Sequence, residues 1–343
     1  MSDALEGIDV PRVEAWFESN VQGLEMPLTF ERIAGGRSNL TYSVRDAGDR
    51  AFALRRPPLG KRLGSAHDMS REHKAIAALA DTPVPVPPIV GFCPDESVNG
   101  APFYVMQFVE GPIVRSSADA ERFDPATRQA IGERVVDTLA AIHAVDPDAV
   151  GLGDLGRKED YVARQLYRWH GQWEKSKTRE LPPVDDLHRR LSERIPEQGP
   201  ATIVHGDYRL DNMILSEQGE VAAVVDWELC TLGDPIADVG LLLVYWSEPD
   251  DELMPLVDAA TTTPGFPTRA ELCERYAERS GRDLAEIDFF VGLGFWKLAI
   301  ILEGVYARYA AGAYGKPNDG FEHFSALVER LAQAADDAER RLP

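Results

Sequence analysis

The stretch that decides the fold is Val204-His205-Gly206-Asp207-Tyr208-Arg209-Leu210-Asp211-Asn212-Met213, which is followed along the chain by Val225-Asp226-Trp227-Glu228. Asp207 can accept a proton from an attacking hydroxyl group. The side-chain oxygens of Asn212 and Asp226 can hold a metal ion. These three groups are what phosphoryl transfer from a magnesium-bound nucleotide needs, since positioning and charge neutralisation provide most of its rate. The alternative is that the two aspartates only cap turns.

The segment between Asn212 and Asp226 predicts a geometry that brings these two residues together. Two apolar, β-prone runs, Ile214-Leu215 and residues 221–225, flank the polar turn Ser216-Glu217-Gln218-Gly219-Glu220. This pattern is typical of a β-hairpin, which returns the chain to its starting end. Paired strands lie about 5 Å apart, so the oxygens of Asn212 and Asp226 are expected to reach one ion. Mg²⁺ fits this set, because it prefers a few carboxylate and amide oxygens alongside phosphate and water.

Length and composition indicate a globular protein with room for two lobes. The chain has 343 residues, of which 44% are hydrophobic and 27% are charged, and its formal net charge is −21. Such a charge argues against nucleic acid or an anionic membrane as a partner. The longest apolar run, residues 289–306, contains Lys297 and Glu303, so it predicts a buried helix and not a membrane span. The acidic start lacks the basic region of a signal peptide and the three cysteines are scattered, so we expect a reduced, cytoplasmic protein.

Hydrophobic periodicity and turn residues predict a β-rich first part and a helical second part. The predicted strands are residues 28–33, 41–44, 51–55, 89–93 and 103–108. They form one small antiparallel sheet, with a helix before it over residues 10–21 and a helix within it over residues 65–79. Glu110-Gly111-Pro112 marks the boundary between the lobes. The helices predicted after it are residues 125–145, 160–177, 184–195, 235–247, 269–280, 286–308 and 320–340.

These motifs resemble those of the aminoglycoside phosphotransferase-like small-molecule kinases, which are protein-kinase-like. The offset between Asp207 and Asn212 is that of the protein-kinase catalytic loop, and Asp226 stands where that fold has its second metal ligand. The resemblance extends over about residues 30–309. It implies an α+β, protein-kinase-like bilobal fold, with a small antiparallel β lobe that binds the nucleotide (residues 1–109) and a larger, mainly helical lobe with the catalytic loop and acceptor site (residues 110–343).

One branch of this superfamily is similar over three further segments. They are Leu54-Arg55-Arg56-Pro57-Pro58, residues 161–181 and Phe295-Trp296-Lys297-Leu298-Ala299-Ile300. That branch contains kinase domains that are fused to acyl-CoA dehydrogenases or encoded beside them. The similarity therefore implies a functional link between this chain and such a dehydrogenase.

The resemblance also implies which residues hold the nucleotide, which would be ATP with Mg²⁺. Gly35 and Gly36 correspond to the phosphate-covering loop, where glycine lets the backbone approach the phosphates. Arg37, Ser38 and Asn39 would donate hydrogen bonds to phosphate oxygens. The pattern differs from Gly-x-Gly-x-x-Gly, so the alternatives are a plain hairpin turn for the glycines and a solvated loop for the three polar residues.

The third predicted strand, the following helix and a hinge at residues 106–110 would supply the other nucleotide contacts. Strand alternation puts Ala53 and Arg55 on one face, so that Ala53 would pack against the adenine ring while Arg55 would reach the α- and β-phosphates. The family more often has lysine at the position of Arg55, and a planar guanidinium cannot replace an ammonium without rearrangement. Glu72 would orient Arg55, unless it is a surface glutamate. Backbone groups of Gln107 and Val109 would bind adenine.

The resemblance gives further residues of the catalytic loop a role. Arg209 would stabilise charge on the transferring phosphoryl group, or pair with a neighbouring carboxylate. His205 would hold the loop by hydrogen bonding, and Asp238 would brace it from below. Asp234 would cap the helix that Pro235 begins.

The acceptor would be a hydroxyl-bearing small molecule between the catalytic loop and the predicted helices 160–177 and 295–309. The first of these helices carries Tyr161, Arg164, Gln165, Arg168, Trp169 and Trp173. Aromatic residues at this spacing are also typical of a helix that faces a core. If the arginines line a pocket, they favour an anionic acceptor such as a hydroxyacyl-CoA, whereas the net charge favours a cationic one.

Two other functions stay open at this point. The first is phosphorylation of an aminoglycoside antibiotic, as in the 3'-type enzymes. The second is a nucleotide-binding pseudokinase, a regulator that binds ATP without transferring phosphate, which Arg55 and the atypical glycine loop would support. The intact set of Asp207, Asn212 and Asp226 argues against the pseudokinase.

Overall fold

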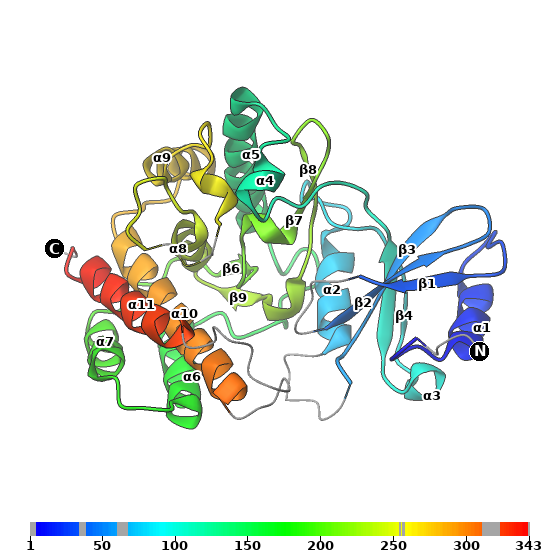
Figure 1. Ribbon diagram of the computed structural model, residues 1–343, viewed down its shortest axis with the longest axis horizontal. Coiled ribbons are helices and arrows are strands. Elements are labelled where there is room, and N and C mark those ends of the chain that lie inside the picture. Colours follow the sequence, from blue (N-terminus) through cyan, green and yellow to red (C-terminus); the bar gives the residue numbers. More distant parts are fainter. Residues whose placement is uncertain are drawn as a thin grey trace.

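A five-stranded antiparallel sheet forms the first part of the chain, and helices form the second (Figure 1). This computed structural model describes residues 5–33, 39–59, 68–253, 255, 258–310 and 323–341. The chain starts in the β-rich part and ends at the far side of the helical part (Figure 1). The predicted α+β, bilobal arrangement is therefore confirmed, whereas the lobe boundary between residues 109 and 110 stays a prediction.

The strands of the sheet are those that the sequence predicts, with ends that differ by at most one residue. They are β1 (Thr29–Arg32), β2 (Leu40–Arg45), β3 (Ala51–Arg56), β4 (Ile89–Cys93) and β5 (Phe103–Gln107), in the order β1-β2-β3-β5-β4. Side chains alternate along β3, because successive residues of a strand point to opposite faces. Phe52 and Leu54 pack in the apolar cluster beneath α1 (Val10–Asn20), whereas Ala53 belongs to the cluster on the other face. Helix α2 (Met69–Leu79) packs against that second face, through β4 and β5.

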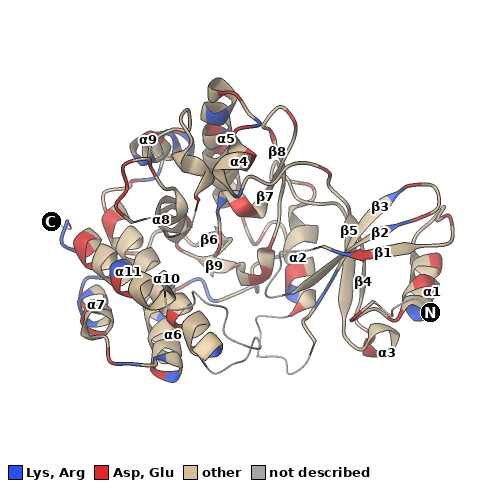
Figure 2. Cartoon of the chain, viewed as in Figure 1, with Lys and Arg blue, Asp and Glu red and all other residues tan. Residues whose placement is uncertain are grey.

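The helical part contains all seven helices that the sequence predicts after the lobe boundary. Its elements are α5 (Pro125–Ala144), α6 (Tyr161–Ser176), α7 (Pro182–Glu193), α8 (Ile236–Tyr245), α9 (Arg269–Ser280), α10 (Ile287–Ala310) and α11 (His323–Glu339). The predicted hairpin is formed by β7 (Met213–Leu215) and β8 (Val221–Val224). Asp234 accepts a hydrogen bond from the N–H of Ile236 at 3.0 Å and so caps α8, as predicted. Figure 2 shows acidic residues spread over both parts of the molecule.

Several short elements were not predicted. They are α3 (Glu96–Asn99), α4 (Ser117–Ala120), the one-turn helices η2 (Leu210–Asn212), η3 (Trp227–Leu229) and η4 (Ala260–Thr262), and the two-stranded sheet of β6 (Thr202–Val204) with β9 (Thr231–Gly233). Strands β6 and β9 bracket the catalytic loop and the hairpin, so their pairing closes this segment into one unit. The sequence does not predict these two strands, because three residues are too few to show the alternation typical of a strand.

Helix α10 is the central helix of the second part. It is long and apolar enough to cross a membrane by length and composition alone. In the structure it packs against α6, α8 and α11, and its middle residues, including Trp296 and Ala299, are buried. The predicted buried helix is therefore confirmed.

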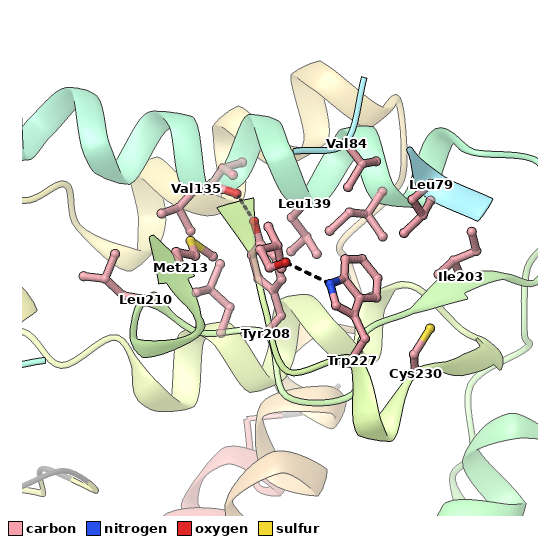
Figure 3. Packing of buried hydrophobic residues seen from close by; sticks show 14 of the residues in the cluster. Leu79, Val84, Val135, Leu139, Ile203, Tyr208, Leu210, Met213, Trp227 and Cys230 are labelled. Carbon is pink, nitrogen blue, oxygen red and sulfur yellow. Dashed lines mark hydrogen bonds between the residues drawn. The ribbon is translucent and has the colours of Figure 1, made fainter. Parts of the chain in front are cut away.

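The largest apolar cluster lies directly behind the catalytic loop (Figure 3). Tyr208, the residue after Asp207, is buried, and its hydroxyl donates to the carbonyl oxygen of Val135 on α5 at 2.7 Å. Trp227, the residue after Asp226, is also buried and donates to the oxygen of Val224 at 2.9 Å. The two predicted acidic site residues are thus each anchored to the core by the aromatic residue that follows.

Candidate active site

The catalytic loop follows β6 and is held from below by one buried carboxylate. Oδ2 of Asp238 on α8 accepts the backbone N–H of His205 at 2.6 Å, and Oδ1 accepts the N–H of Gly206 at 2.9 Å. Gly206 has a φ of +84°, and a Cβ there would lie 2.9 Å from the carbonyl oxygen of Leu229, so the position requires glycine. These contacts put Asp238 beneath the loop, where the resemblance placed it.

His205 uses both ring nitrogens to hold the loop. Nε2 lies 3.1 Å from the carbonyl oxygen of Val225, and the backbone N–H of Asp207 donates to Nδ1 at 3.3 Å. A carbonyl oxygen can only accept, so Nε2 carries the proton and the imidazole is in one tautomer. His205 therefore joins the loop to the end of β8, in agreement with the predicted supporting role.

A second layer of buried polar groups lies behind Asp238. Nε2 of His143 lies 3.3 Å from Oδ2 of Asp238, and Nδ1 lies 2.7 Å from the hydroxyl of Tyr276. Burial lowers the pKa of His143, although the neighbouring Asp238 opposes this shift. Burial alone would raise the pKa of Asp238, but the hydrogen bonds from His143 and from the N–H of Gly206 leave it below its usual value. The brace is therefore a carboxylate at neutral pH.

Asp207, the predicted base, is hydrogen-bonded to the predicted metal ligand Asn212. Nδ2 of Asn212 donates to Oδ2 of Asp207 at 3.0 Å and to its backbone oxygen at 2.8 Å. Since the amide nitrogen is used within the loop, Oδ1 is the atom that can face a metal ion. Nε of Arg209 lies 3.6 Å from Oδ2 of Asp207, and its Nη1 lies 3.3 Å from Oδ2 of Asp211. Arg209 thus has the carboxylate pairing that the sequence left open, directly beside the base.

The hairpin brings the two predicted metal ligands to the same end of β7 and β8. Met213 pairs with Val224, and the N–H of Val225 donates to the backbone oxygen of Asn212 at 2.9 Å. Asp226 is the next residue, in the left-handed region with a φ of 68°. Such a conformation is uncommon for a residue other than glycine, and it turns the chain out of the strand into η3. The predicted proximity of Asn212 and Asp226 agrees with this register.

Arg55 on β3 lies at the centre of a cluster of three carboxylates. Its Nε donates to Oε2 of Glu72 on α2 at 3.0 Å, while Nη2 donates to Oδ1 of Asp226 and lies 3.7 Å from Oε2 of Glu228. Glu72 is only 1% exposed, so the alternative of a surface glutamate is wrong. Burial raises the pKa of Glu72, and the charge of Arg55 opposes this shift. Burial lowers the pKa of Arg55, but the surrounding acidic groups, Glu72 first, raise it on balance.

The phosphate-covering loop is described only at its last predicted residue. Gly35, Gly36, Arg37 and Ser38 lie outside the described residues. Asn39 is 2% exposed, so a solvated position is wrong for this residue. Its Nδ2 donates to Oε2 of Glu228 at 2.9 Å. This hydrogen bond joins the end of the predicted phosphate-covering loop to Glu228 of η3.

The predicted adenine contacts lie at the ends of β3 and β5. Ala53 is buried on the face that carries Arg55, as the alternation predicts. The backbone N–H of Gln107 already donates to the carbonyl oxygen of Pro88 at 2.8 Å. A contact between adenine and Gln107 would therefore use the carbonyl oxygen and not the N–H group. Val109 follows the end of β5 and lies outside the strand.

A cavity of about 790 Å³ opens beside the catalytic loop. It lies between α6, α10, the loop at Gly206 and the start of β9. Its basic lining residues are Arg71, Arg157, Arg164, Arg168 and Lys297, and its acidic ones are Asp160 and Glu228. Among the described residues, only Arg157 of these five cations lies within 4 Å of a carboxylate, that of Asp160 at 3.8 Å. The cavity is therefore basic, although the chain has a net charge of −21.

The aromatic residues of α6 divide between the cavity and the core. Trp169 lines the cavity, and Lys297 lies 5.4 Å from the centre of its ring. Tyr161 is buried at the cavity wall. Trp173 is fully buried in the apolar core, and its Nε1 donates to Oδ1 of Asp185 at 3.1 Å. The aromatic residues of α6 therefore serve both predicted purposes: Trp169 faces the pocket, and Trp173 faces the core.

Three residues of the site received no role from the sequence. Glu228 ends the quoted Val-Asp-Trp-Glu motif, and Arg71 precedes Glu72, so both lay beside assigned residues. Lys297 had a clearer signal, because it interrupts a long apolar run. A charge in the middle of a buried helix costs free energy unless it has a partner, and this makes such a lysine a candidate site residue.

Comparisons with known proteins relate the chain to a family of phosphotransferases and to part of larger acyl-CoA dehydrogenase family members. The sequence model of the phosphotransferase enzyme family matches residues 29–290. Acyl-CoA dehydrogenase family member 10 of Mus musculus is 37% identical over 317 residues, which cover 91% of this chain and 29% of that protein. Acyl-CoA dehydrogenase family member 11 of Homo sapiens is 31% identical over 341 residues, which cover 97% of this chain and 43% of that protein. The chain thus spans less than half the length of these curated relatives.

Solved structures agree with the sequence comparison. A candidate aminoglycoside phosphotransferase from Ralstonia eutropha is 32% identical, with a TM-score of 0.82 and coverage of 98% of this chain and 99% of that one. Choline kinase from Cryptosporidium parvum has a TM-score of 0.67 at 13% identity, with 96% of each chain covered. At such low identity the likeness concerns the fold alone. The comparisons confirm the predicted protein-kinase-like fold.

Proposed function

The chain belongs to the phosphotransferase enzyme family, and we propose that it transfers the γ-phosphoryl group of ATP to a hydroxyl group of a small anionic molecule. The single observation that carries the anionic acceptor is the basic cavity beside the catalytic loop. An acidic protein that concentrates cations in one cavity binds negative groups there, because the local charges outweigh a distant, screened net charge.

In the proposed reaction Asp207 takes the proton of the acceptor hydroxyl. The acceptor oxygen forms a bond to the γ-phosphorus, the bond from that phosphorus to the bridging oxygen breaks, and ADP leaves with the electron pair. The hydrogen bond from Asn212 keeps Oδ2 of Asp207 in place. Arg209, which lies beside Asp207, stabilises the charge on the transferring group.

The donor set beside Asp207 fits Mg²⁺. Asn212 presents an amide oxygen, because its nitrogen is bonded to Asp207, and Asp226 presents a carboxylate at the same end of the hairpin. Few carboxylate and amide ligands plus phosphate oxygens are what Mg²⁺ prefers. When bound, the ion would neutralise phosphate charge. Arg55 donates to Asp226, and Asn39 donates to the neighbouring Glu228, so both are placed to donate to phosphate oxygens there.

The acceptor that fits best is a hydroxyacyl-CoA-like metabolite. Its pyrophosphate and 3'-phosphate groups offer several negatively charged oxygens, and its thioester offers a neutral carbonyl oxygen. The cations of the cavity that could receive them include Arg164, Arg168 and Lys297. The names of the curated relatives also contain acyl-CoA dehydrogenase. A functional link to such a dehydrogenase, and a cytoplasmic location, remain part of the proposal.

An aminoglycoside acceptor is the second candidate, because the name of the similar Ralstonia eutropha protein refers to aminoglycosides. A polycation would meet four arginines and a lysine in the cavity, with only two carboxylates. Repulsion between like charges in a binding site strongly weakens the binding of an unsuitable ligand. The cavity therefore favours the anionic acceptor.

The test is ADP release from Mg-ATP by the purified protein, with hydroxyacyl-CoAs, kanamycin-type aminoglycosides, choline and homoserine as acceptors. Release that a hydroxyacyl-CoA stimulates, and that disappears in Asp207→Asn, is the expected result. Stimulation by kanamycin alone would establish the second candidate. Tight nucleotide binding without transfer to any acceptor would point to the pseudokinase.

A further inference from the structure

Lys297 is the residue through which α10 reaches the catalytic loop. It is the one charged residue between Asp288 and Glu303 of that helix. Its Nζ donates to the carbonyl oxygen of Gly206 at 3.0 Å and lies 5.4 Å from the centre of the Trp169 ring. Gly206 immediately precedes Asp207, so a cation is placed directly against the segment that carries the predicted base.

The ammonium group has no paired carboxylate in the part of the chain that the structure describes. Burial lowers the pKa of Lys297 and the charges of Asp207 and Asp238 oppose this shift, but neither carboxylate forms an ion pair with the ammonium group within 4 Å. An ammonium has three N–H donors, of which Gly206 accepts one. The ring of Trp169 offers only a weak electrostatic contact. A partly buried cation with spare donors is costly unless another acceptor enters the site.

The position of the spare donors indicates which acceptor this is. Lys297 lines the 790 Å³ cavity together with Arg164 and Arg168, so its ammonium borders the space beside the catalytic loop. Gly206 also lines this cavity, so a ligand that lies in it and presents its hydroxyl group to the neighbouring Asp207 would lie beside this ammonium. A carbonyl or carboxylate oxygen near the hydroxyl group would accept the second hydrogen bond.

We propose that Lys297 is a specificity-determining residue, whose ammonium group donates a hydrogen bond to a carbonyl or carboxylate oxygen that the acceptor carries close to its reactive hydroxyl group. The inference rests on the proposed function, since it assigns one contact to the acceptor of that reaction. Because the same ammonium holds Gly206, it fixes the acceptor relative to Asp207. It also repels an acceptor with a cationic group at that position.

The experiment compares two ligands that differ only in the proposed contact. They are 3-hydroxyhexanoyl-CoA and S-(3-hydroxyhexyl)-CoA, in which a methylene group replaces the thioester carbonyl. Binding is measured by calorimetry with Mg²⁺ and a non-hydrolysable ATP analogue, so the readout does not depend on turnover. We expect wild type to prefer the carbonyl compound by about 10-fold or more, as for a hydrogen bond to a charged group. Free 3-hydroxyhexanoate distinguishes a carboxylate partner from a thioester partner.

Three variants make the comparison specific. Lys297→Met should bind both CoA compounds with nearly equal affinity, and Lys297→Arg should keep part of the preference. Lys175→Met removes an exposed lysine of α6 that does not line the cavity, and it should behave as wild type. Nucleotide affinity and melting temperature identify any variant that fails to fold. If Lys297→Met fails to fold, the proposal is tested by the preference of wild type for the carbonyl compound and by the reduced preference of Lys297→Arg.

The proposal is overturned by equal binding of the two ligands to wild type, by binding of neither, or by an undiminished preference in folded Lys297→Met. Failure of the proposed function is a separate result. In that case wild type binds the carbonyl compound with the expected preference, and Lys297→Met loses the preference, but no ADP forms when ATP replaces its analogue.

Discussion

The guanidinium group of Arg55 is hydrogen-bonded to the carboxylate of Asp226, although the two residues lie 171 positions apart in the chain. The same group donates to Glu72 at 3.0 Å. A guanidinium has divergent N–H donors, so it can contact two carboxylates at once, which a compact ammonium does less well. This geometry gives a physical reason for arginine at a position where the family more often has lysine. It also joins the predicted phosphate-binding residue to the predicted metal ligand.

Replacing Arg55 with Met should weaken Mg-ATP binding and destabilise the fold. Glu72 would be left buried without its cation, which typically costs about 3 kcal/mol or more. The double variant Arg55→Met/Glu72→Met should regain stability but not affinity, because only the buried charge has been removed. Chemical denaturation and calorimetry measure the two effects. A single variant as stable as wild type would show that the ion pair contributes little.

Asp207→Asn should lower kcat by about 10²- to 10⁴-fold, the usual contribution of a general base. Its affinity for Mg-ATP should stay within about twofold of wild type, because the asparagine oxygen can still accept the hydrogen bond from Asn212. Asp211→Asn is the matched control in the same loop, and its effect on kcat should be much smaller. Comparable losses in the two variants would contradict a specific role for Asp207.

Asp226→Asn should remove the Mg²⁺-dependent part of nucleotide binding. A neutral amide is a weaker ligand for a hard cation than a carboxylate. Dissociation constants for ATP, measured with Mg²⁺ and with a chelator, should differ strongly in wild type and hardly at all in the variant. If the variant keeps the wild-type difference, Asp226 is not a metal ligand.

The stability of the protein should fall as the pH is lowered from 7 to 5, in part because of His143. Burial lowers the pKa of its imidazole in the folded state, so below about pH 6.5 the unfolded chain binds a proton that the folded chain does not. Stability then rises with pH, by at most about 1.4 kcal/mol per pH unit for this one group. His143→Gln should show a shallower dependence of melting temperature on pH. His73 and His188, whose pKa values burial also lowers, act equally in both proteins.

Tyr208→Phe should reduce the free energy of unfolding by about 1 to 2 kcal/mol. The buried hydroxyl donates to the oxygen of Val135 at 2.7 Å (Figure 3), and its removal loses one hydrogen bond. Denaturant unfolding checks the value, and Tyr167→Phe is the control, since Tyr167 is 84% exposed on α6. Equal stability of the two variants would contradict a role for this hydrogen bond in anchoring the catalytic loop.

The sequence by itself determined the features that depend on neighbouring residues. Alternation and turn residues predicted the hairpin that carries Asn212 and Asp226 to one end, and the motif predicted the loop around Asp207. Helical spacing predicted α5, α6 and α10 within a few residues. Such patterns are readable because backbone geometry repeats every two or 3.6 residues, whatever the rest of the chain does.

Only the tertiary structure decided which distant charges meet. It placed Arg55 between Glu72 and Asp226, brought Lys297 of α10 to Gly206, and paired β6 with β9 around the loop. Spacing along one helix could not separate Trp169, which lines the cavity, from the buried Trp173. These outcomes depend on how helices and sheet pack against one another. Packing is set by the sum of many contacts between residues far apart in the chain, and no short stretch of sequence contains that sum.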